Sequence, residues 1–215
     1  MQALPFDVRF ELDGWKLFWA LLELESGHTD SMLTLTHEVA DRVRQEMRLE
    51  TLSEHPTAAG LRKLFRAAGC DPTRYRPSSE ALLRRLLKGE EMPTILPLVD
   101  LNNCLSASLA VPCCVMAEET LSPPFTFRAG KAGESYESLR GPFSLEGKPL
   151  LADAQGPCDA PITGGQRVKV TAETRRAWLV AYLPAGVVDP AMVEQRLMEL
   201  LASASVARVH CTGAS

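Results

Sequence analysis

The order of the predicted elements constrains the fold of this chain more than any other feature of its sequence. Up to about Val111, two strand-like segments are followed by stretches with helical spacing of apolar residues. Beyond Val111 the chain changes to short apolar segments separated by turns rich in Gly, Pro and Ser, which is typical of β-structure. Helices and strands that are gathered in different parts of the chain favour an α+β fold.

The first sixty residues predict two strands and a long helix. Apolar and polar residues alternate over residues 6–12, as in a half-buried strand. Residues 15–25 form a dense apolar run that we interpret as a buried strand, although its Leu and Ala content also suits a helix. Residues 31–48 have helical periodicity. No long linker follows, so we expect residues 1–215 to form a single domain, with residues 1–60 packed on the rest.

The helices predicted at residues 57–69 and 76–88 carry a basic segment. Residues 61–88 contain eight basic and two acidic residues, whereas the whole chain has a net charge of −4. A local basic face on an acidic protein attracts phosphate without general binding to nucleic acids. Two solvated helix faces would explain the same pattern. The candidates for contact with RNA phosphates are Arg76, Arg84, Arg85, Lys88 and Arg167.

Further along the chain, residues 98–109 have helical character, and residues 176–183 are among the segments expected to be strands. Asp189 and Pro190 are suited to the start of a helix, because Asp is a good cap and Pro is tolerated in the first turn. The sequence therefore predicts a β-rich second half that ends in a C-terminal amphipathic helix.

The cysteines and histidines favour neither a metal site nor a disulfide framework. The sequence has no Cys-x-x-Cys pair, and none of the four His residues has metal-ligand spacing with another His or Cys. We therefore expect reduced thiols, no cofactor and no metal. No run of eighteen apolar residues and no signal peptide are visible, so we expect a cytoplasmic protein without a membrane partner.

Three stretches share an order and spacing with one known family. Residues 76–103 end in Val99-Asp100-x-x-Asn103, residues 127–134 contain Arg128 and a Gly-Glu turn, and residues 150–175 contain Thr163-Gly164-Gly165. Together they resemble the B3/B4 domain, which edits tRNA in the beta subunit of phenylalanyl-tRNA synthetase. The resemblance covers about residues 76–184. It implies an α+β B3/B4 fold and a free-standing relative of that domain.

The activity implied by the resemblance is hydrolysis in trans of the ester between a wrong amino acid and tRNA, with tRNA or aminoacyl-tRNA as the partner. Such an ester is already activated, so its hydrolysis needs a placed water, a restrained 3′ end and a stabilised oxyanion. We expect four residues around the ester: Asn103, Thr163, Gly164 and Gly165. We expect three more in the substrate pocket: Asp100, Cys114 and Arg128.

Each of these residues also has an ordinary structural interpretation. The Gly164-Gly165 pair can form a tight turn, Asn103 can lie on a helix surface, Asp100 can hold a backbone amide, and Cys114 can be a packed thiol. The functional interpretation therefore requires Asn103, Cys114 and the two glycines to line a common hollow.

The sequence departs from the synthetase pattern at two positions. Cys114 occupies the place of a histidine, and residues 177–182 lack the glutamate that the synthetase carries after its Thr-Arg motif. Discrimination between tyrosine and phenylalanine depends on a polar partner for the hydroxyl. We therefore expect an aminoacyl group other than tyrosyl. A non-catalytic tRNA- or RNA-binding module and an amino-acid-binding protein that reuses the pocket remain the alternatives.

Overall fold

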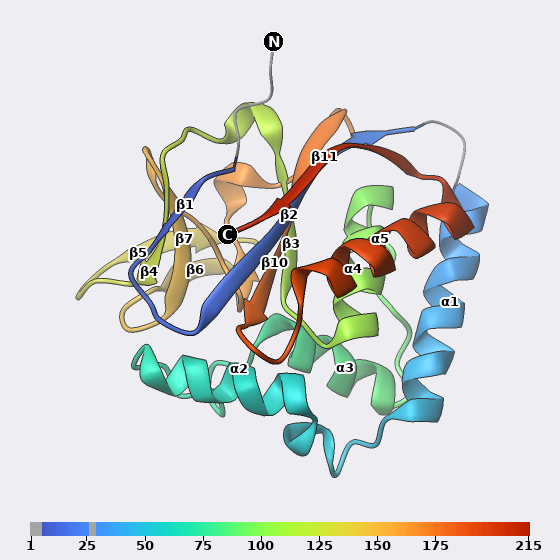
Figure 1. The fold of residues 1–215 in the computed structure, drawn as a ribbon, viewed down its shortest axis with the longest axis horizontal. Helices are drawn as coiled ribbons and strands as arrows, with labels where there is room; N and C mark the ends of the chain where they lie inside the picture. Colours follow the sequence, from blue (N-terminus) through green and yellow to red (C-terminus); the bar gives the residue numbers. More distant parts are fainter. Residues whose placement is uncertain (1–5, 26–28) are drawn as a thin grey trace.

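The computed structural model describes residues 6–25 and 29–215, and over these residues it confirms the predicted α+β fold (Figure 1). The first half of the chain forms β1 (Val8–Phe10), β2 (Trp15–Leu24), α1 (Thr29–Glu46), α2 (Pro56–Ala67), α3 (Ser78–Leu87) and α4 (Pro97–Leu109). The second half forms β3 (Cys113–Ala117), β4 (Phe125–Ala129), β5 (Ser135–Ser138), β6 (Gly141–Ser144), β7 (Pro149–Asp153), β8 (Gly156–Ala160), β9 (Thr163–Gly164), β10 (Arg176–Pro184), α5 (Pro190–Ala204) and β11 (Ala207–Ala214). Short 3₁₀ turns lie at Leu52–Glu54, Glu118–Thr120 and Gln166–Val168.

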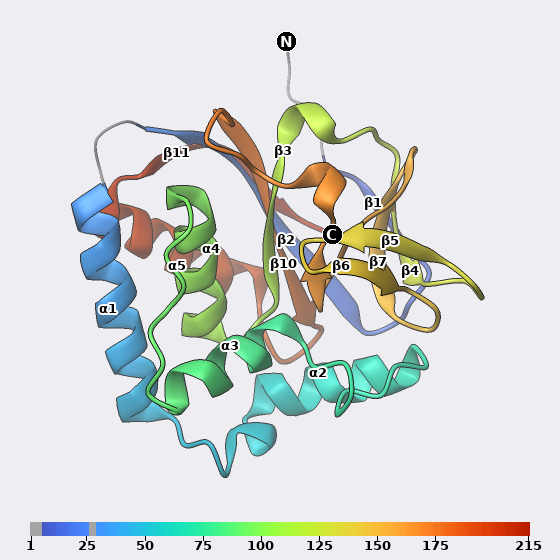
Figure 2. The same cartoon turned by 180° about the vertical axis from the view of Figure 1, so that it is seen from behind.

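A four-stranded antiparallel sheet, in the order β11-β2-β10-β3, separates two layers of the molecule. Helices α4 and α5 pack on one face of this sheet, and α1 and α3 pack on these helices in the outer part of the same layer (Figures 1 and 2). The five-stranded sheet, in the order β1-β4-β7-β8-β9, lies on the other side. Helix α2 lies at the lower end of both layers in Figure 1 and contacts β10.

Strand β10 shows how the central sheet divides the core. Successive side chains of a strand point to opposite faces. Leu179 and Leu183 contribute to the core shared with the helices, whereas Trp178, Val180 and Tyr182 contribute to the core shared with the five-stranded sheet. All five side chains are buried. Burial on both faces explains why this strand is a continuous apolar run in the sequence, without the alternation of a half-exposed strand.

The β5–β6 hairpin lies against β9, at the end of the five-stranded sheet. Ser138 forms an isolated bridge with Gly165, and the amide of Leu139 donates to the carbonyl of Gly164 at 3.0 Å. The hydroxyl of Tyr136 donates to the carbonyl of Thr163 at 2.5 Å. These contacts hold the hairpin over the segment that contains the predicted Gly-Gly pair.

The final element is a strand that the sequence did not predict. We expected the chain to end in an amphipathic helix, and α5 does form, with Asp189 accepting from the amide of Ala191 at 2.9 Å. Beyond it, β11 returns along β2 as an edge of the four-stranded sheet. Residues 207–212 alternate apolar side chains (Ala207, Val209, Cys211) with polar ones, which is the pattern of a half-buried strand, and our prediction did not include it.

Among the described residues, no helix is both long and apolar enough to span a membrane.

Candidate functional site

Three polar side chains meet on the face of the central sheet that points away from the helical layer. The hydroxyl of Tyr182 in β10 donates to Oδ2 of Asp159 in β8 at 2.5 Å. The sulfur of Cys114 in β3 lies 3.8 Å from the same hydroxyl. Asp159 is 1% exposed and Tyr182 is fully buried. A carboxyl group, a phenol and a thiol are therefore held together inside an otherwise apolar core.

Burial controls the protonation of this cluster. It raises the pKa of Asp159 to about 7, although hydrogen bonds from neighbours, chiefly Tyr182, act in the opposite direction. Burial, followed by the nearby charge of Asp159, also raises the pKa of the Cys114 thiol and of the Tyr182 hydroxyl. Cys114 is therefore a protonated thiol at neutral pH, which makes it a poor nucleophile.

The Gly164-Gly165 pair lies beside Asp159. In the β8–β9 hairpin, Gly164 is the register partner of Asp159, and a Cβ atom added to Gly164 would lie 3.5 Å from Asp159 Oδ1. A Cβ atom on Gly165 would lie 2.2 Å from the carbonyl oxygen of Cys158. Only glycine permits this backbone approach at position 165. The structure thus brings Cys114 and Gly164 next to Asp159 and places Gly165 against the backbone of Cys158, whereas Thr163 is the register partner of Ala160 and points to the opposite face of β9.

The structure does not bring Asn103 and Asp100 into this group. Both lie on α4, on the helical face of the sheet, whereas Cys114 belongs to the core on the opposite face. Among the described residues, Asn103 has no hydrogen bond to the cluster. The buried carboxylate of Asp100 accepts from the amide of Ile95 at 2.8 Å, so it fixes the chain entering α4. Burial raises the pKa of Asp100.

The two arginines expected near the pocket already hold carboxylates. Arg128 donates to both oxygens of Glu134 at 2.7 Å, and the contact lowers the pKa of Glu134. Arg167 donates to both oxygens of Asp153 at 2.8 and 3.2 Å. Bidentate contacts of this kind are strong and directional. They tie β4 to the turn before β5, and the Gln166–Val168 turn to the end of β7.

The basic helices divide into paired and unpaired charges. Arg76 lies 3.9 Å from Glu80, and Arg85 lies 3.4 Å from Glu90. Within the part of the chain that the structure describes, Arg84 and Lys88 have no carboxylate within 4.0 Å. They stand one helical turn apart on α3, so their side chains share one side of the helix.

Comparison with known families agrees with the resemblance seen in the sequence. The family model of the B3/4 domain matches residues 60–203. The chain belongs to the B3/4 domain family. The comparison with curated proteins found no match.

Among solved structures, this B3/4 protein is similar to an N-terminal fragment of the phenylalanyl-tRNA synthetase beta subunit from Pyrococcus horikoshii. The two share 14% sequence identity with a TM-score of 0.46. The alignment covers 90% of this chain and 46% of that fragment, so the B3/4 protein spans less than half of the fragment's length.

Our sequence analysis missed two members of the cluster, Tyr182 and the central acid Asp159. The signal for Asp159 was a single acidic residue between apolar neighbours, in Cys158-Asp159-Ala160. A charged residue within such a segment is either exposed on a turn or buried with a specific partner. The partner is Tyr182, 23 residues further along the chain, and no local pattern indicates that contact.

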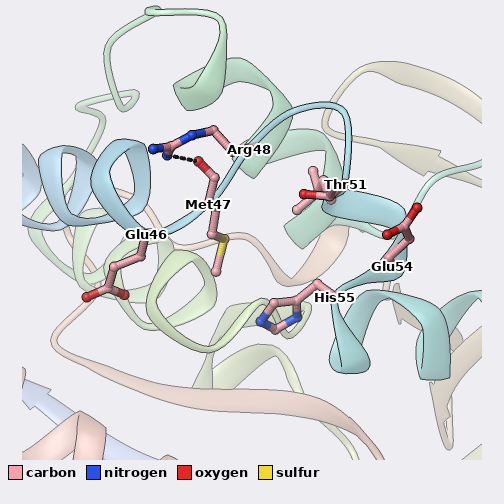
Figure 3. Close-up of a pocket in the computed structure, with 7 residues that line it drawn as sticks. Glu46, Met47, Arg48, Thr51, Glu54 and His55 are labelled. Atoms are coloured by element: carbon pink, nitrogen blue, oxygen red, sulfur yellow. Dashed lines mark hydrogen bonds between the residues drawn. The ribbon is translucent and has the colours of Figure 1, made fainter.

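A separate hollow of about 280 Å³ lies between the end of α1 and the start of α2 (Figure 3). It is lined by Glu46, Met47, Arg48, Thr51, Leu52, Glu54 and His55. Burial lowers the pKa of His55, which favours the neutral imidazole. None of the residues predicted for the site lines this hollow, and it lies before the segment that matches the family model. Among the described residues, no cluster of His, Cys, Asp and Glu is arranged to hold a metal ion.

Proposed function

We propose that this B3/4 protein acts in trans to remove a wrong amino acid from tRNA, by attack of a water molecule on the aminoacyl ester. Membership of the B3/4 family supports this proposal. The single observation that carries it furthest is that Cys114 and Gly164 adjoin a buried carboxylate, with Thr163 and Gly165 as the chain neighbours of Gly164. These are residues for which the resemblance implies a role in the editing pocket.

In this proposal Gly164, which has no side chain of its own, admits the ester once Leu139 moves aside, and the hydroxyl of the half-buried neighbour Thr163 orients the water or the developing oxyanion. Asn103 has no contact with the ester in this proposal, because it lies on the other side of the central sheet. Cys114 contributes to the shape of the pocket as a neutral thiol.

The proposed substrate carries an aminoacyl group other than tyrosyl. The hydroxyl of Tyr182 already occupies Oδ2 of Asp159, and its ring lies 5.6 Å from that of Phe127 within the core. A tyrosyl group would compete with this internal phenol for the same carboxylate. A smaller aminoacyl group avoids the competition.

The test is a panel of mischarged tRNAs incubated with the protein, in which loss of the ester is compared with the spontaneous rate. We expect accelerated hydrolysis of at least one small aminoacyl-tRNA and none of tyrosyl-tRNA. Thr163→Val should slow the reaction by roughly tenfold or more, because it removes a hydroxyl close to the reacting centre. The same change at the half-buried Thr126 of β4 is the matched control and should have no effect. If every ester in the panel decays at the spontaneous rate, the proposal is wrong.

A non-catalytic tRNA-binding function is the second candidate, and one observation favours it. Asp159 and Tyr182 are almost completely buried, so the centre of the cluster is closed to solvent in this conformation. This candidate predicts tRNA binding that weakens steeply with salt and leaves the ester intact. Thermal stabilisation by a free amino acid without affinity for tRNA would instead indicate an amino-acid-binding protein.

Both tRNA-dependent candidates predict a role for the unpaired charges of α3. The double variant Arg84→Gln/Lys88→Gln should weaken tRNA binding and reduce the slope of log Kd against log salt by about two, because each lost phosphate contact removes roughly one released counterion. The measurement is a filter-binding or fluorescence titration at several salt concentrations. The control is Lys16→Gln/Arg42→Gln, which removes two exposed basic groups from other elements. Equal weakening in both double variants would contradict a specific basic face on α3.

A further inference from the structure

The two oxygens of the Asp159 carboxylate have different surroundings. Oδ2 accepts from Tyr182 at 2.5 Å, whereas Oδ1 is buried and has no hydrogen-bond partner among the residues that the structure describes. A buried acceptor without a partner loses its hydration without compensation, so such atoms are rare in native proteins. A partner for Oδ1 that is supplied by a ligand would remove this cost.

Oδ1 faces a small space that exists because residue 164 is glycine. A Cβ atom added to Gly164 would lie 3.5 Å from Oδ1 and 3.1 Å from Cδ1 of Leu139. The end of the Leu139 side chain therefore closes the space beside Oδ1, and a heavy atom enters it only when that end shifts. Leu139 is 55% exposed and lies in the turn between β5 and β6, which also contains Gly141 with a φ of 100°. Part of the boundary of this space is thus a flexible side chain in contact with solvent.

The charge around Asp159 indicates what kind of group would fit there. The titratable groups that surround it come from four strands: Cys114 of β3, Tyr136 of β5, Cys158 of β8 and Tyr182 of β10. None of them is a cation, and within the described residues no Lys, Arg or His forms an ion pair with Asp159. A buried carboxylate is stabilised most by a positively charged donor.

We infer that Oδ1 of Asp159 receives the α-ammonium group of the aminoacyl ligand, in the space above Gly164, after the side chain of Leu139 has moved aside. This inference rests on the proposed function for the identity of the ligand. Asp159 is then the residue that distinguishes a free aminoacyl group from an N-acylated or peptidyl group. The distinction is chemical, because acylation removes both the positive charge and two of the three donors of the ammonium.

Binding of a stable nucleoside analogue tests this inference without requiring catalysis. The probe is 3′-(glycylamino)-3′-deoxyadenosine, which carries the ammonium, no side chain and an amide in place of the ester. Its N-acetyl derivative is the matched ligand. The wild-type protein should bind the free amine at least about tenfold more tightly than the acetylated form, as expected for a charge-assisted hydrogen bond.

Two variants locate the effect. Asp159→Asn should abolish the preference for the free amine because it removes the negative charge. Gly164→Ala keeps Asp159 but places a methyl group in the space beside Oδ1, and it too should abolish the preference. The new methyl group would contact only the end of the Leu139 side chain closely, so this variant should fold. Asp41→Asn, at an exposed position of α1, is the control and should retain the preference.

The outcomes separate this inference from the proposed function. Equal affinity of the wild-type protein for the free and acetylated probes overturns the inference, as does an undiminished preference in both variants. If N-acetylated and free aminoacyl-tRNA are hydrolysed at equal rates, the proposed function stands but the inference about Asp159 is wrong. A clear preference for the free amine, with no hydrolysis of any mischarged tRNA, supports recognition by Asp159 and rejects the proposed hydrolysis.

Discussion

The Asp159→Asn substitution is expected to increase the free energy of unfolding more at pH 7 and above than at pH 4. The difference between the two pH values should be roughly 3 to 4 kcal/mol. The reason is the cost of ionising a carboxyl group inside the core. Burial raises the pKa of Asp159 from 3.8 to about 7 in the folded state. One pKa unit corresponds to about 1.4 kcal/mol.

The sign follows from proton binding. Between pH 3.8 and about 7 the folded protein holds a proton on Asp159 that the unfolded chain has released. Stability therefore falls as the pH rises through this window, and the full penalty is reached above the folded pKa. Asn carries no proton to release, and its amide oxygen can still accept from Tyr182.

Urea unfolding of both proteins at several pH values between 4 and 8 measures this effect. Groups that titrate identically in the two proteins contribute equally to both free energies of unfolding. Their contributions therefore drop out when one free energy is subtracted from the other. The control is Asp41→Asn, whose difference from wild type should stay constant over the same range, because Asp41 is exposed. A constant difference for Asp159→Asn as well would show that Asp159 is ionised at no cost, which contradicts the raised pKa.

Arg62→Met is expected to lower the free energy of unfolding by about 3 to 5 kcal/mol. The guanidinium of Arg62 in α2 donates to both carboxylate oxygens of Glu80 in α3, each at 2.8 Å. The Glu80 side chain is 1% exposed, and the only other cation near it among the described residues is Arg76, at 3.9 Å. Removal of Arg62 therefore leaves a buried carboxylate without its bidentate partner, which costs far more than the loss of a surface ion pair.

The matched control is Arg85→Met, which breaks the ion pair between Arg85 of α3 and Glu90 in the loop that follows this helix. Both of those side chains are about half exposed, so the change should cost about 1 kcal/mol or less. The double variant Arg62→Met/Glu80→Leu should regain much of the lost stability, since it leaves no buried charge. Chemical denaturation measures all three. Equal and small effects of Arg62→Met and Arg85→Met would mean that Glu80 is hydrated in solution.

The sequence predicted most of the elements because their signals are local. Residues 15–25 and 176–183 were expected to be strands, and they became β2 and β10 in the centre of the sheet. Helices α1 to α5 were all expected from apolar periodicity and, for α5, from Asp189 and Pro190. Strand β11 was missed although residues 207–212 alternate apolar and polar side chains, as expected for a half-buried strand.

The candidate site was only partly accessible from the sequence. Asn103, Cys114, Gly164 and Gly165 were expected to line one hollow; the structure places Cys114 and Gly164 beside Asp159, which was not expected there, but leaves Asn103 on the other side of the central sheet. The roles predicted for Arg128 and Arg167 depended on free guanidinium groups. Their partners Glu134 and Asp153 are acidic residues of the same chain, and the sequence does not show which acids lie next to which bases.

By itself, then, the amino-acid sequence determined the family, the α+β class and the positions of the helices, since these follow from residue order and from periodicity along the backbone. Only the tertiary structure decided which face of β10 Tyr182 occupies, which oxygen of Asp159 lacks a partner, and which arginines are already neutralised. The physical reason is that burial and charge pairing arise between strands and helices that are distant in the chain. The pKa values that depend on them cannot be read from the sequence of any single segment.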